Sequence, residues 1–230
     1  VQVCVNLRPA DIQTTIKEIR PTLMCSVPRF WEKVYAGVQE KIAQESGLRK
    51  AMMLDALKVG KMHNIDYLRA GKTPPLMLHL KYKFYEKTIY ALLKKTIGIE
   101  NGNFFPTAGA AVSDEICEFV HSVGINMVVG YGLTESTATV SCFLDKGYEI
   151  GSVGTVMPDL EVKIGENNEI LLRGKTITTG YYKKPEATAA AIDKDGWFHT
   201  GDAGYLKGNH LYLTERIKDL FKTSNGKYCL

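Results

Sequence analysis

A short stretch near the middle of the chain constrains the fold most strongly. Residues 128–137 read Val-Val-Gly-Tyr-Gly-Leu-Thr-Glu-Ser-Thr. Two β-branched residues lead into a turn in which glycines flank an aromatic residue, and a hydroxyl and a carboxylate follow at once. This order predicts a buried strand that ends at a nucleotide site, with a helix beginning directly after it.

The side chains of this stretch suit the parts of a nucleotide. Gly130 and Gly132 leave the backbone free of Cβ atoms beside a ligand, and the ring of Tyr131 offers a flat face to a purine. Thr134 can reach a phosphate oxygen, and the carboxylate of Glu135 suits a magnesium ion that bridges phosphates. The free N–H groups of the helix start would also face the anion. Taken alone, the stretch also fits a structural alternative, a strand end with a buried tyrosine in a tight turn.

Composition and charge place the chain among ordinary globular proteins. Its 230 residues suffice for one large domain, or for one domain and a smaller one. The net charge of +4 is small and dispersed, and we expect no nucleic-acid partner. The five cysteines form no Cys-x-x-Cys pair, so we expect buried core thiols and a cytoplasmic location. No apolar run of about 18 residues is present, so no transmembrane helix is predicted.

The first 98 residues carry two kinds of apolar pattern. Residues 1–7 and 22–27 have strand patterns on either side of a helical stretch from about 9 to 20, which predicts a β-α-β unit of a parallel sheet. Residues 28–98 are helical throughout. The part from 76 to 93 mixes lysines with aromatic residues, which usually indicates a solvated outer face but leaves open a peripheral contact with the inner face of a membrane.

Two further strands are predicted at about 103–107 and 125–129, and Ser113 is expected to cap the helix between them. Both strands end in turns of small residues, and ligands of open α/β sheets bind where the carboxyl ends of strands meet. After about residue 149 short alternating segments separated by Gly-, Asn- and Asp-rich turns predict an antiparallel β subdomain, with the form of a small barrel, up to about residue 215.

Other residues suit the same site. Asp202 follows a glycine and can accept hydrogen bonds from both hydroxyls of a ribose, although a turn aspartate that binds nearby backbone is the simpler reading. Arg216 can bind ribose or phosphate oxygens, or form a surface salt bridge. The run Gly109-Ala110-Ala111 can flank a purine, or can simply be a turn of small residues.

Together, in this order and spacing, the motifs resemble the adenylate-forming superfamily of acyl-CoA synthetases. The matching runs are Gly-Tyr-Gly-Leu-Thr-Glu at 130–135, Gly-Trp-Phe-His-Thr-Gly-Asp at 196–202 and Arg-Ile-Lys-Asp at 216–219. Arg-Pro-Thr at 20–22, Ser-Val-Pro-Arg-Phe-Trp-Glu-Lys-Val at 26–34 and the helical insert that follows make the chain similar to bacterial long-chain fatty-acid–CoA ligases.

The resemblance implies an α/β fold that is part of a large N-terminal adenylation domain. A mostly parallel sheet with flanking helices would be followed by a small antiparallel β-barrel-like subdomain. The implied divisions are an adenylate-binding subdomain at 1–149 with its insert at about 28–98, a β-rich subdomain at 150–215, and at 216–230 the hinge and the start of a truncated C-terminal domain. We expect both ends to be cuts in a longer chain, with a phosphate-binding loop before the first residue and a catalytic lysine after the last.

The resemblance also implies roles for single residues. It assigns nucleotide contacts to Gly109, Ala110, Ala111, Gly130, Tyr131, Gly132, Thr134, Asp202 and Arg216. Glu135 matches the magnesium ligand and acts with Thr134 in catalysis, while Lys218 matches the hinge about which the C-terminal domain rotates. The sequence departs from the family pattern at Thr107-Ala108, where Ser-Gly is usual.

The implied reaction has two halves. A long-chain fatty acid reacts with ATP and Mg2+ to give an acyl-adenylate and pyrophosphate, and coenzyme A then displaces AMP to give acyl-CoA. The 230-residue piece itself is expected to be inactive. Two alternatives stay open, namely a fatty-acid–AMP ligase that delivers to a carrier protein and a non-catalytic nucleotide-binding module. The sequence sets neither the acyl chain length nor the oligomeric state.

Overall fold

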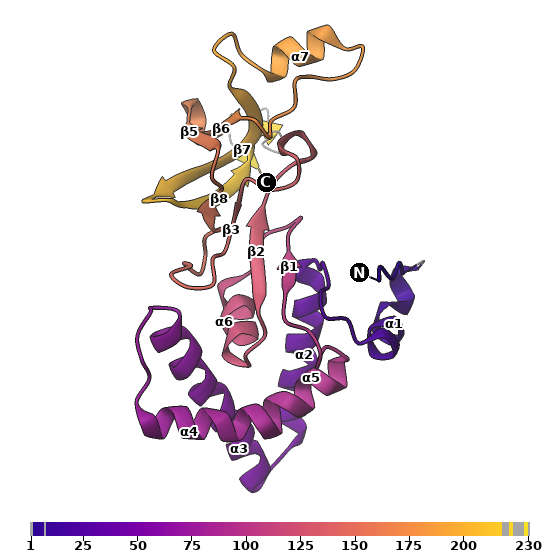
Figure 1. Cartoon of the computed structure of the whole chain (residues 1–230), viewed down its shortest axis with the longest axis vertical. Coiled ribbons are helices and arrows are strands. Elements are labelled where there is room, and N and C mark those ends of the chain that lie inside the picture. The colour runs from indigo at the N-terminus through magenta and orange to yellow at the C-terminus, as the bar shows by residue number, and fades with distance from the viewer. Residues whose placement is uncertain (1, 7, 218–220, 223–227, 230) are drawn as a thin grey trace. The chain divides into compact units, whose positions relative to one another are not determined.

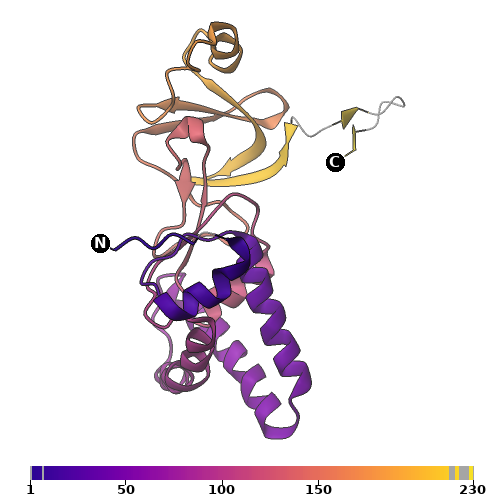
Figure 2. The same cartoon turned by 90° about the vertical axis from the view of Figure 1, so that its right-hand side faces the viewer.

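The computed structural model describes residues 2–6, 8–217, 221–222 and 228–229. The chain forms two compact units, each described here by itself. The first unit comprises Val1–Val128 and Asp145–Ile150, and the second comprises Val129–Leu144 and Gly151–Leu230. The chain therefore enters the second unit, returns briefly to the first, and enters the second again, as the colours of Figures 1 and 2 allow the reader to follow.

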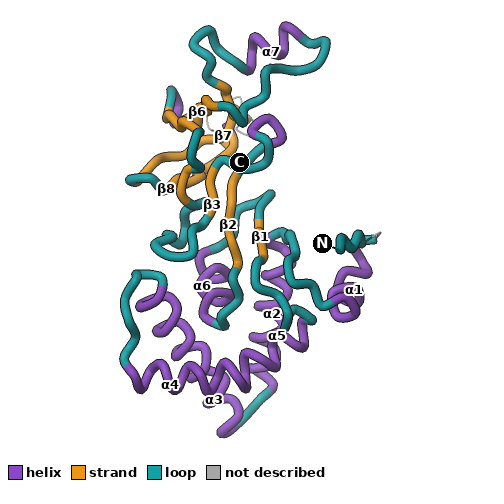
Figure 3. The backbone as a smooth tube through the Cα atoms, in the orientation of Figure 1, coloured by secondary structure: helices purple, strands orange, loops and turns teal. Residues whose placement is uncertain are grey.

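The first unit is mostly helical. Its helices are the 3-10 turn η1 Pro9–Asp11, α1 Ile12–Ile19, α2 Pro28–Gln44, α3 Gly47–Gly60, the π-helix η2 Lys61–Leu68, α4 Leu76–Tyr85, the π-helix η3 Glu86–Tyr90, α5 Ala91–Ile97 and α6 Asp114–Ser122. The helical pattern over 28–98 corresponds to α2 through α5 (Figure 3). The predicted cap of α6 is present, because the backbone N–H of Ile116 donates to Ser113 Oγ at 3.4 Å. None of the described helices combines the length and apolar composition that a bilayer span requires.

The predicted β-α-β unit at the start of the chain forms only in part. Isolated parallel bridges join Ser26 to Thr107 at the end of strand β1, Phe105–Thr107, and Leu23 to Phe104 just before it. Residues 2–6 form no strand, and Val3 and Val5 are 79% and 76% exposed. An alternating pattern stabilises a strand only when another backbone pairs with it, and no described residue pairs with 2–6 in a ladder.

The cysteine side chains also differ in part from the prediction. Cys117 is buried and Cys142 is half-buried, but Cys4 and Cys25 are exposed, so the prediction of core cysteines is wrong for these two. Both belong to the segments that were expected to be buried strands. The side chain of Cys229 lies outside the described residues.

A buried tryptophan joins α2 to β1. Trp31 is fully buried, and its indole Nε1 donates to Ser26 Oγ at 2.9 Å and to Thr107 Oγ1 at 3.0 Å. The two hydroxyl oxygens lie 2.8 Å apart, and the ring of Phe105 meets the indole edge-on. One side chain therefore holds the start of a long helix, a bridged segment and a strand together.

We expect Trp31→Phe to lower the free energy of unfolding by about 2–3 kcal/mol, because it leaves a cavity and removes the donor that the buried Thr107 hydroxyl and the half-buried Ser26 hydroxyl share. Urea unfolding measures the loss. The matched control is Trp197→Phe, at a half-buried ring that lies 4.4 Å from the guanidinium of Arg173. A phenyl ring keeps that cation–π contact, so the control should lose no more than about 1 kcal/mol. Equal losses would contradict the role given to Trp31.

A buried histidine makes the first unit sensitive to acid. His121 on α6 is 9% exposed, and its ring lies 4.7 Å from that of Tyr148. Burial, and next the positive charge of Arg69, lower the pKa of His121 from 6.5 to about 4. The folded protein therefore keeps this imidazole neutral at a pH where the unfolded chain protonates it.

Stability should fall as the pH falls from 6.5 towards 4, because in that interval the unfolded chain binds a proton that the folded chain does not. The loss due to His121 should reach about 3 kcal/mol, since one pKa unit corresponds to about 1.4 kcal/mol. Urea unfolding at several pH values, with His121→Gln as the comparison, measures this. The variant should have a flatter pH dependence, and identical slopes would show that His121 does not cause the effect.

The second unit is built on an antiparallel sheet. Its strands are β2 Met127–Tyr131, which begins in the first unit, β3 Ser141–Cys142, β4 Thr155–Val156, β5 Leu160–Ile164, β6 Glu169–Gly174, β7 Phe198–Lys207 and β8 His210–Arg216. They follow the order β2-β3-β4-β8-β7-β6-β5, and each neighbouring pair in this order is antiparallel. The other elements are the 3-10 turns η4 Thr134–Ser136 and η5 Glu166–Asn168, helix α7 Pro185–Ala191, and the pair β9 Phe221–Lys222 with β10 Tyr228–Cys229.

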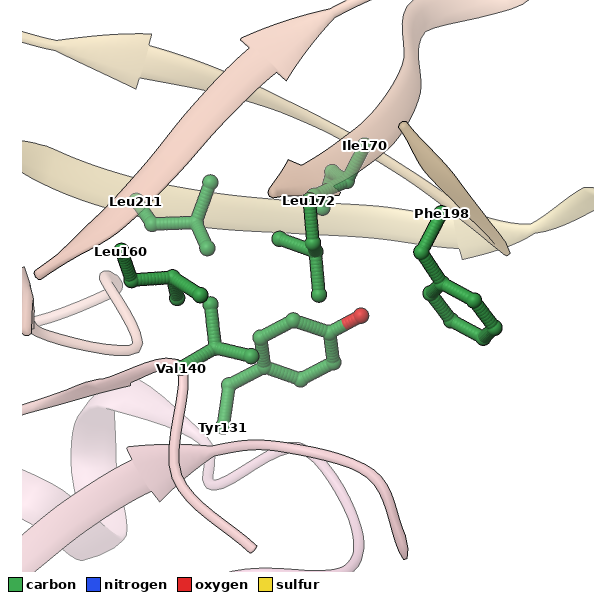
Figure 4. Close-up of a cluster of buried hydrophobic side chains, with 7 residues drawn as sticks. All are labelled: Tyr131, Val140, Leu160, Ile170, Leu172, Phe198 and Leu211. Carbon is green, nitrogen blue, oxygen red and sulfur yellow. The ribbon is translucent and has the colours of Figure 1, made fainter. Parts of the chain in front are cut away.

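The core of this unit contains the ring of Tyr131. Figure 4 shows the ring beside Val140 and Leu172, in a cluster of buried side chains from five strands and a loop. The cluster consists of Tyr131, Val140, Leu160, Ile170, Leu172, Phe198 and Leu211. The α/β class is confirmed, with a mixed set of strand pairings, and the predicted β-rich segment is antiparallel. The described sheet continues from β2 to β1, and β1 and β5 lie at opposite ends of its order, so the strands do not close into a barrel.

Candidate nucleotide site

The central stretch ends its strand where the sequence predicts, but no helix follows. After Tyr131 the chain makes one 3-10 turn at Thr134–Ser136, and Thr137 and Ala138 then have φ of 53° and 78°. The hydroxyl of Ser136 accepts from the backbone N–H of Leu133 and donates to the same residue's carbonyl oxygen. Such local side-chain bonds compete with a helix, and left-handed residues end one. The predicted helix N-terminus beside a phosphate is therefore wrong.

The two glycines make room for the protein's own backbone. A Cβ atom on Gly132 would lie 1.6 Å from the carbonyl oxygen of Ala138, and one on Gly130 would lie 3.2 Å from that of Ser141. We predicted that a ligand would lie beside both glycines. Strand β3 occupies that space at Gly130, and the loop at Ala138 occupies it at Gly132. The glycines thus shape the turn, and any contact with a nucleotide stays a prediction.

Three predicted residues form one hydrogen-bonded chain. The hydroxyl of Tyr131 donates to Asp202 Oδ2 at 2.7 Å, and Arg216 Nε donates to Asp202 Oδ1 at 3.0 Å. Asp202 and Arg216 are directly paired between β7 and β8, so strand register places them together. The Asp202 side chain is 8% exposed and that of Arg216 is 65% exposed. A buried carboxylate with one exposed guanidinium is thus held where β8 ends beside β7.

The backbone before Asp202 is anchored from β6. The N–H of Gly201 donates to Glu169 Oε1 at 2.9 Å, and His199 Nδ1 lies 2.9 Å from Glu169 Oε2. The N–H of Asp202 donates to Thr200 Oγ1 at 3.0 Å, and that hydroxyl donates to the carbonyl oxygen of Ile170 at 2.7 Å. The Thr-Gly-Asp segment of β7 is therefore held by hydrogen bonds to the neighbouring strand β6.

Burial keeps the phenol of Tyr131 protonated. Loss of solvation, and then the hydrogen bond to Asp202, raise the pKa of Tyr131 well above the usual 10. The phenol of Tyr131 therefore remains a donor throughout the physiological range. The ring is only 8% exposed, so stacking on a purine stays a prediction.

The carboxylate of Glu135 has a partner that the sequence did not reveal. The hydroxyl of Tyr181 donates to Glu135 Oε1 at 2.9 Å, and this bond raises the pKa of Tyr181. The N–H of Thr178 donates to the carbonyl oxygen of Glu135 at 2.7 Å. No spacing rule links residues 46 positions apart, and the Thr-Thr-Gly-Tyr-Tyr run only indicates a loop.

One depression of the second unit brings predicted site residues together. Gly132, Thr134, Glu135 and Arg216 all line it. The exposed hydroxyl of Thr134 and the guanidinium of Arg216 are donors suited to phosphate oxygens. No group of three potential metal ligands occurs among the described residues. Magnesium needs no such group, because it is usually held by one or two carboxylates together with the oxygens of a bound phosphate. Glu135 fits that requirement.

The remaining candidates lie elsewhere. Gly109, Ala110 and Ala111 belong to the first unit, where Gly109 has φ of 91° and a Cβ atom added to it would meet no other atom within 4 Å. They form an exposed bend after β1, as the small-residue turn predicts. Lys218, the predicted hinge, lies outside the described residues.

The chain matches the family of AMP-binding enzymes over residues 2–182. It belongs to this family. Its similarity to curated AMP-binding enzymes extends over nearly the whole chain. The long-chain-fatty-acid–CoA ligase ACSBG2 of Mus musculus is 29% identical over 219 residues, which cover 93% of this chain and 32% of the ligase. The putative fatty-acid–CoA ligase fadD11 of Mycobacterium tuberculosis is 31% identical, with 94% and 38% covered. This AMP-binding chain therefore spans about a third of the length of these relatives.

Solved structures support the fold of the AMP-binding family. The adenylation domain of a carboxylate reductase from Mycobacterium chelonae superposes with a TM-score of 0.62 over 96% of this chain and 31% of its own, at 22% identity. A fatty acyl CoA synthetase from Mycobacterium tuberculosis gives 0.55 over 95% and 35%, at 21% identity. The α/β architecture is thus that of adenylation domains.

We expect Tyr131→Phe to lower the free energy of unfolding by about 1.5–3 kcal/mol, because the buried Asp202 loses a hydrogen bond. Tyr181→Phe is a matched control, since its hydroxyl also donates to a carboxylate but its side chain is 37% exposed. Water can replace that donor, so the control should lose less than about 1 kcal/mol. Urea unfolding of both variants tests the difference, and equal losses would mean that Asp202 does not depend on Tyr131.

Proposed function

We propose that this chain is part of a ligase that activates a long-chain fatty acid with ATP and transfers the acyl group to coenzyme A. The observation that carries the proposal is the buried Asp202, bound by Tyr131 and by Arg216, in a unit where Arg216 also lines the depression of Thr134 and Glu135. Membership of the AMP-binding family and the names of the relatives support it.

In this proposal Asp202 binds the ribose. Tyr131 donates to one of its carboxylate oxygens and Arg216 to the other, and a carboxylate oxygen can accept more than one hydrogen bond, so the two ribose hydroxyls can donate to it as well. Tyr131 and Arg216 hold the carboxylate in place. Adenine would adjoin Tyr131 with Gly130 and Gly132, and also the run from Gly109 through Ala110 to Ala111.

The phosphates would lie at the depression of the second unit. Thr134 would donate its hydroxyl to a phosphate oxygen, and Glu135 would hold magnesium, which would supply positive charge beside the phosphate oxygens. A fatty carboxylate oxygen then bonds to the α-phosphorus as pyrophosphate leaves, and the coenzyme A thiolate next bonds to the acyl carbon as AMP leaves. No side chain of this chain acts as nucleophile. Lys218 would serve as the hinge between the two steps.

For the complete protein we propose the division predicted from sequence, with an adenylate-binding subdomain at 1–149, a β-rich subdomain at 150–215 and the hinge region at 216–230. We also propose a cytoplasmic protein with peripheral membrane contact through α4. Leu76, Met77 and Phe84 on this helix are 72%, 77% and 54% exposed, and lysines lie among them. Exposed apolar side chains beside lysines suit an anionic lipid surface.

The test is AMP formation by the complete protein with ATP, Mg2+ and palmitate, with and without coenzyme A. Turnover should require both palmitate and coenzyme A, and Asp202→Ala should raise KM for ATP at least tenfold through loss of the ribose contact. Asp195→Ala, at an exposed turn, is the control and should leave KM unchanged. The 230-residue chain alone should give no palmitate-dependent ATP–pyrophosphate exchange.

Three outcomes would contradict the proposal. Pyrophosphate release without a need for coenzyme A would indicate a ligase that stops at the adenylate. No release with any fatty acid would indicate a nucleotide-binding module without this activity. An unchanged KM in Asp202→Ala would remove the ribose assignment.

A further inference from the structure

The carboxylate of Glu135 is half-buried and forms no ion pair with any described residue. Within the described part of the chain, its side chain accepts one hydrogen bond, which the hydroxyl of Tyr181 donates to Oε1 at 2.9 Å. Partial removal of a carboxylate from water costs free energy unless a cation or further donors compensate. Glu135 lines the depression of the second unit, and a cation bound in that depression would supply the missing charge.

The loop that carries Tyr181 is attached to η4 and to the residue after it by two further hydrogen bonds. The backbone N–H of Thr178 donates to the carbonyl oxygen of Glu135 at 2.7 Å. The hydroxyl of Thr137 donates to the carbonyl oxygen of Thr176 at 2.7 Å. The phenol therefore reaches the Glu135 carboxylate from a loop whose backbone is already held beside that residue.

Gly180 allows the same loop to pass close to α7. It has φ of 141°, and a Cβ atom added to it would lie 2.5 Å from the side chain of Thr188 on that helix. The Thr188 hydroxyl accepts from the backbone N–H of Tyr181 at 2.9 Å, and the carbonyl oxygen of Tyr181 accepts from the N–H of Lys184 at 3.1 Å. Backbone hydrogen bonds therefore position the Tyr181 side chain, although it is 37% exposed.

This arrangement is the one expected around a metal-binding carboxylate. Such a carboxylate is itself held by a hydrogen bond that fixes its orientation, and loss of the donor weakens metal binding about 10- to 100-fold. Magnesium is sensitive to ligand orientation because it demands nearly ideal octahedral geometry. A phenol is a neutral donor, so it orients Glu135 without neutralising the charge that attracts a cation. A lysine or arginine at the position of Tyr181 would neutralise it.

We propose that Tyr181 is a positioning residue of the magnesium site, because its hydroxyl holds Glu135 Oε1 so that Oε2 is directed to Mg2+ at the phosphates of ATP. The inference rests on the proposed function, since it takes Glu135 as the magnesium ligand. Tyr181 itself would touch neither the metal ion nor the nucleotide. The loop from Thr176 to Tyr181 would thus set the affinity of the site for magnesium.

Binding of α,β-methylene-ATP to the complete protein tests this role. Isothermal titration calorimetry with excess Mg2+, and then with EDTA, gives two affinities whose ratio measures how strongly magnesium assists nucleotide binding. Glu135→Gln should lower the ratio about tenfold or more, because the ligand loses its charge. Tyr181→Phe should lower it about three- to tenfold, since water replaces an exposed donor but does not fix the carboxylate. The affinity in EDTA should be unchanged in Tyr181→Phe.

Tyr182→Phe is the matched control. The Tyr182 side chain is 86% exposed, and its ring lies 5.3 Å from Lys183 Nζ. A phenyl ring keeps that cation–π contact, so both affinities should equal those of the parent. Thermal unfolding should show that both phenylalanine variants remain folded like the parent.

The proposal and the function on which it rests fail in different ways. If Glu135→Gln leaves the ratio unchanged, Glu135 is not the magnesium ligand, and the proposal falls with that assignment. If Glu135→Gln lowers the ratio and Tyr181→Phe does not, the magnesium assignment stands and the proposal alone is overturned. It is also overturned if Tyr181→Phe weakens binding equally with Mg2+ and with EDTA, or if Tyr182→Phe has the same effect as Tyr181→Phe.

Discussion

A buried carboxylate is the constraint on which the second unit depends. Removing Asp202 from water is costly unless donors replace the solvent, and here Tyr131 and Arg216 supply them. The phenol comes from the end of β2 and the guanidinium from β8, while the Thr-Gly-Asp segment of β7 is held by Glu169 on β6. Four strands must therefore be in register before this charge is stable. A site built in this way is positioned by the sheet and not by its ligand.

The sequence predicted those parts of the fold that rest on local periodicity. The helical stripe of α2, the cap at Ser113 and the strand that ends at Tyr131 need only neighbouring residues, and all three are present. The segment at 2–6 had the right alternation but lacks a partner among the described residues. Strand formation depends on a second backbone, which no local pattern can supply.

The sequence predicted which residues form the candidate nucleotide site, but not the hydrogen bonds between them. The motifs named Tyr131, Asp202 and Arg216, and left open whether Tyr131 is a free aromatic face or a buried residue at a strand end. The ring is buried, and its hydrogen bond to Asp202 was not foreseen. Likewise the flexibility of Gly132 was evident, but the carbonyl of Ala138 that fills its missing Cβ was not. In both cases the contacting atom, the Asp202 carboxylate or the Ala138 carbonyl oxygen, comes from another segment of the chain. Tertiary packing therefore determines which of its possible roles each residue has.

The path of the chain through the two units bears on its synthesis. Residues 129–144 belong to the second unit, but the strands that complete their core come after residue 150. Tyr131 is made 71 residues before Asp202. At about 5–20 residues per second the ribosome needs roughly 4 to 14 seconds to supply the partner. During that time the apolar end of β2 lacks the strands that bury it. The nascent chain therefore most needs protection from aggregation in this interval.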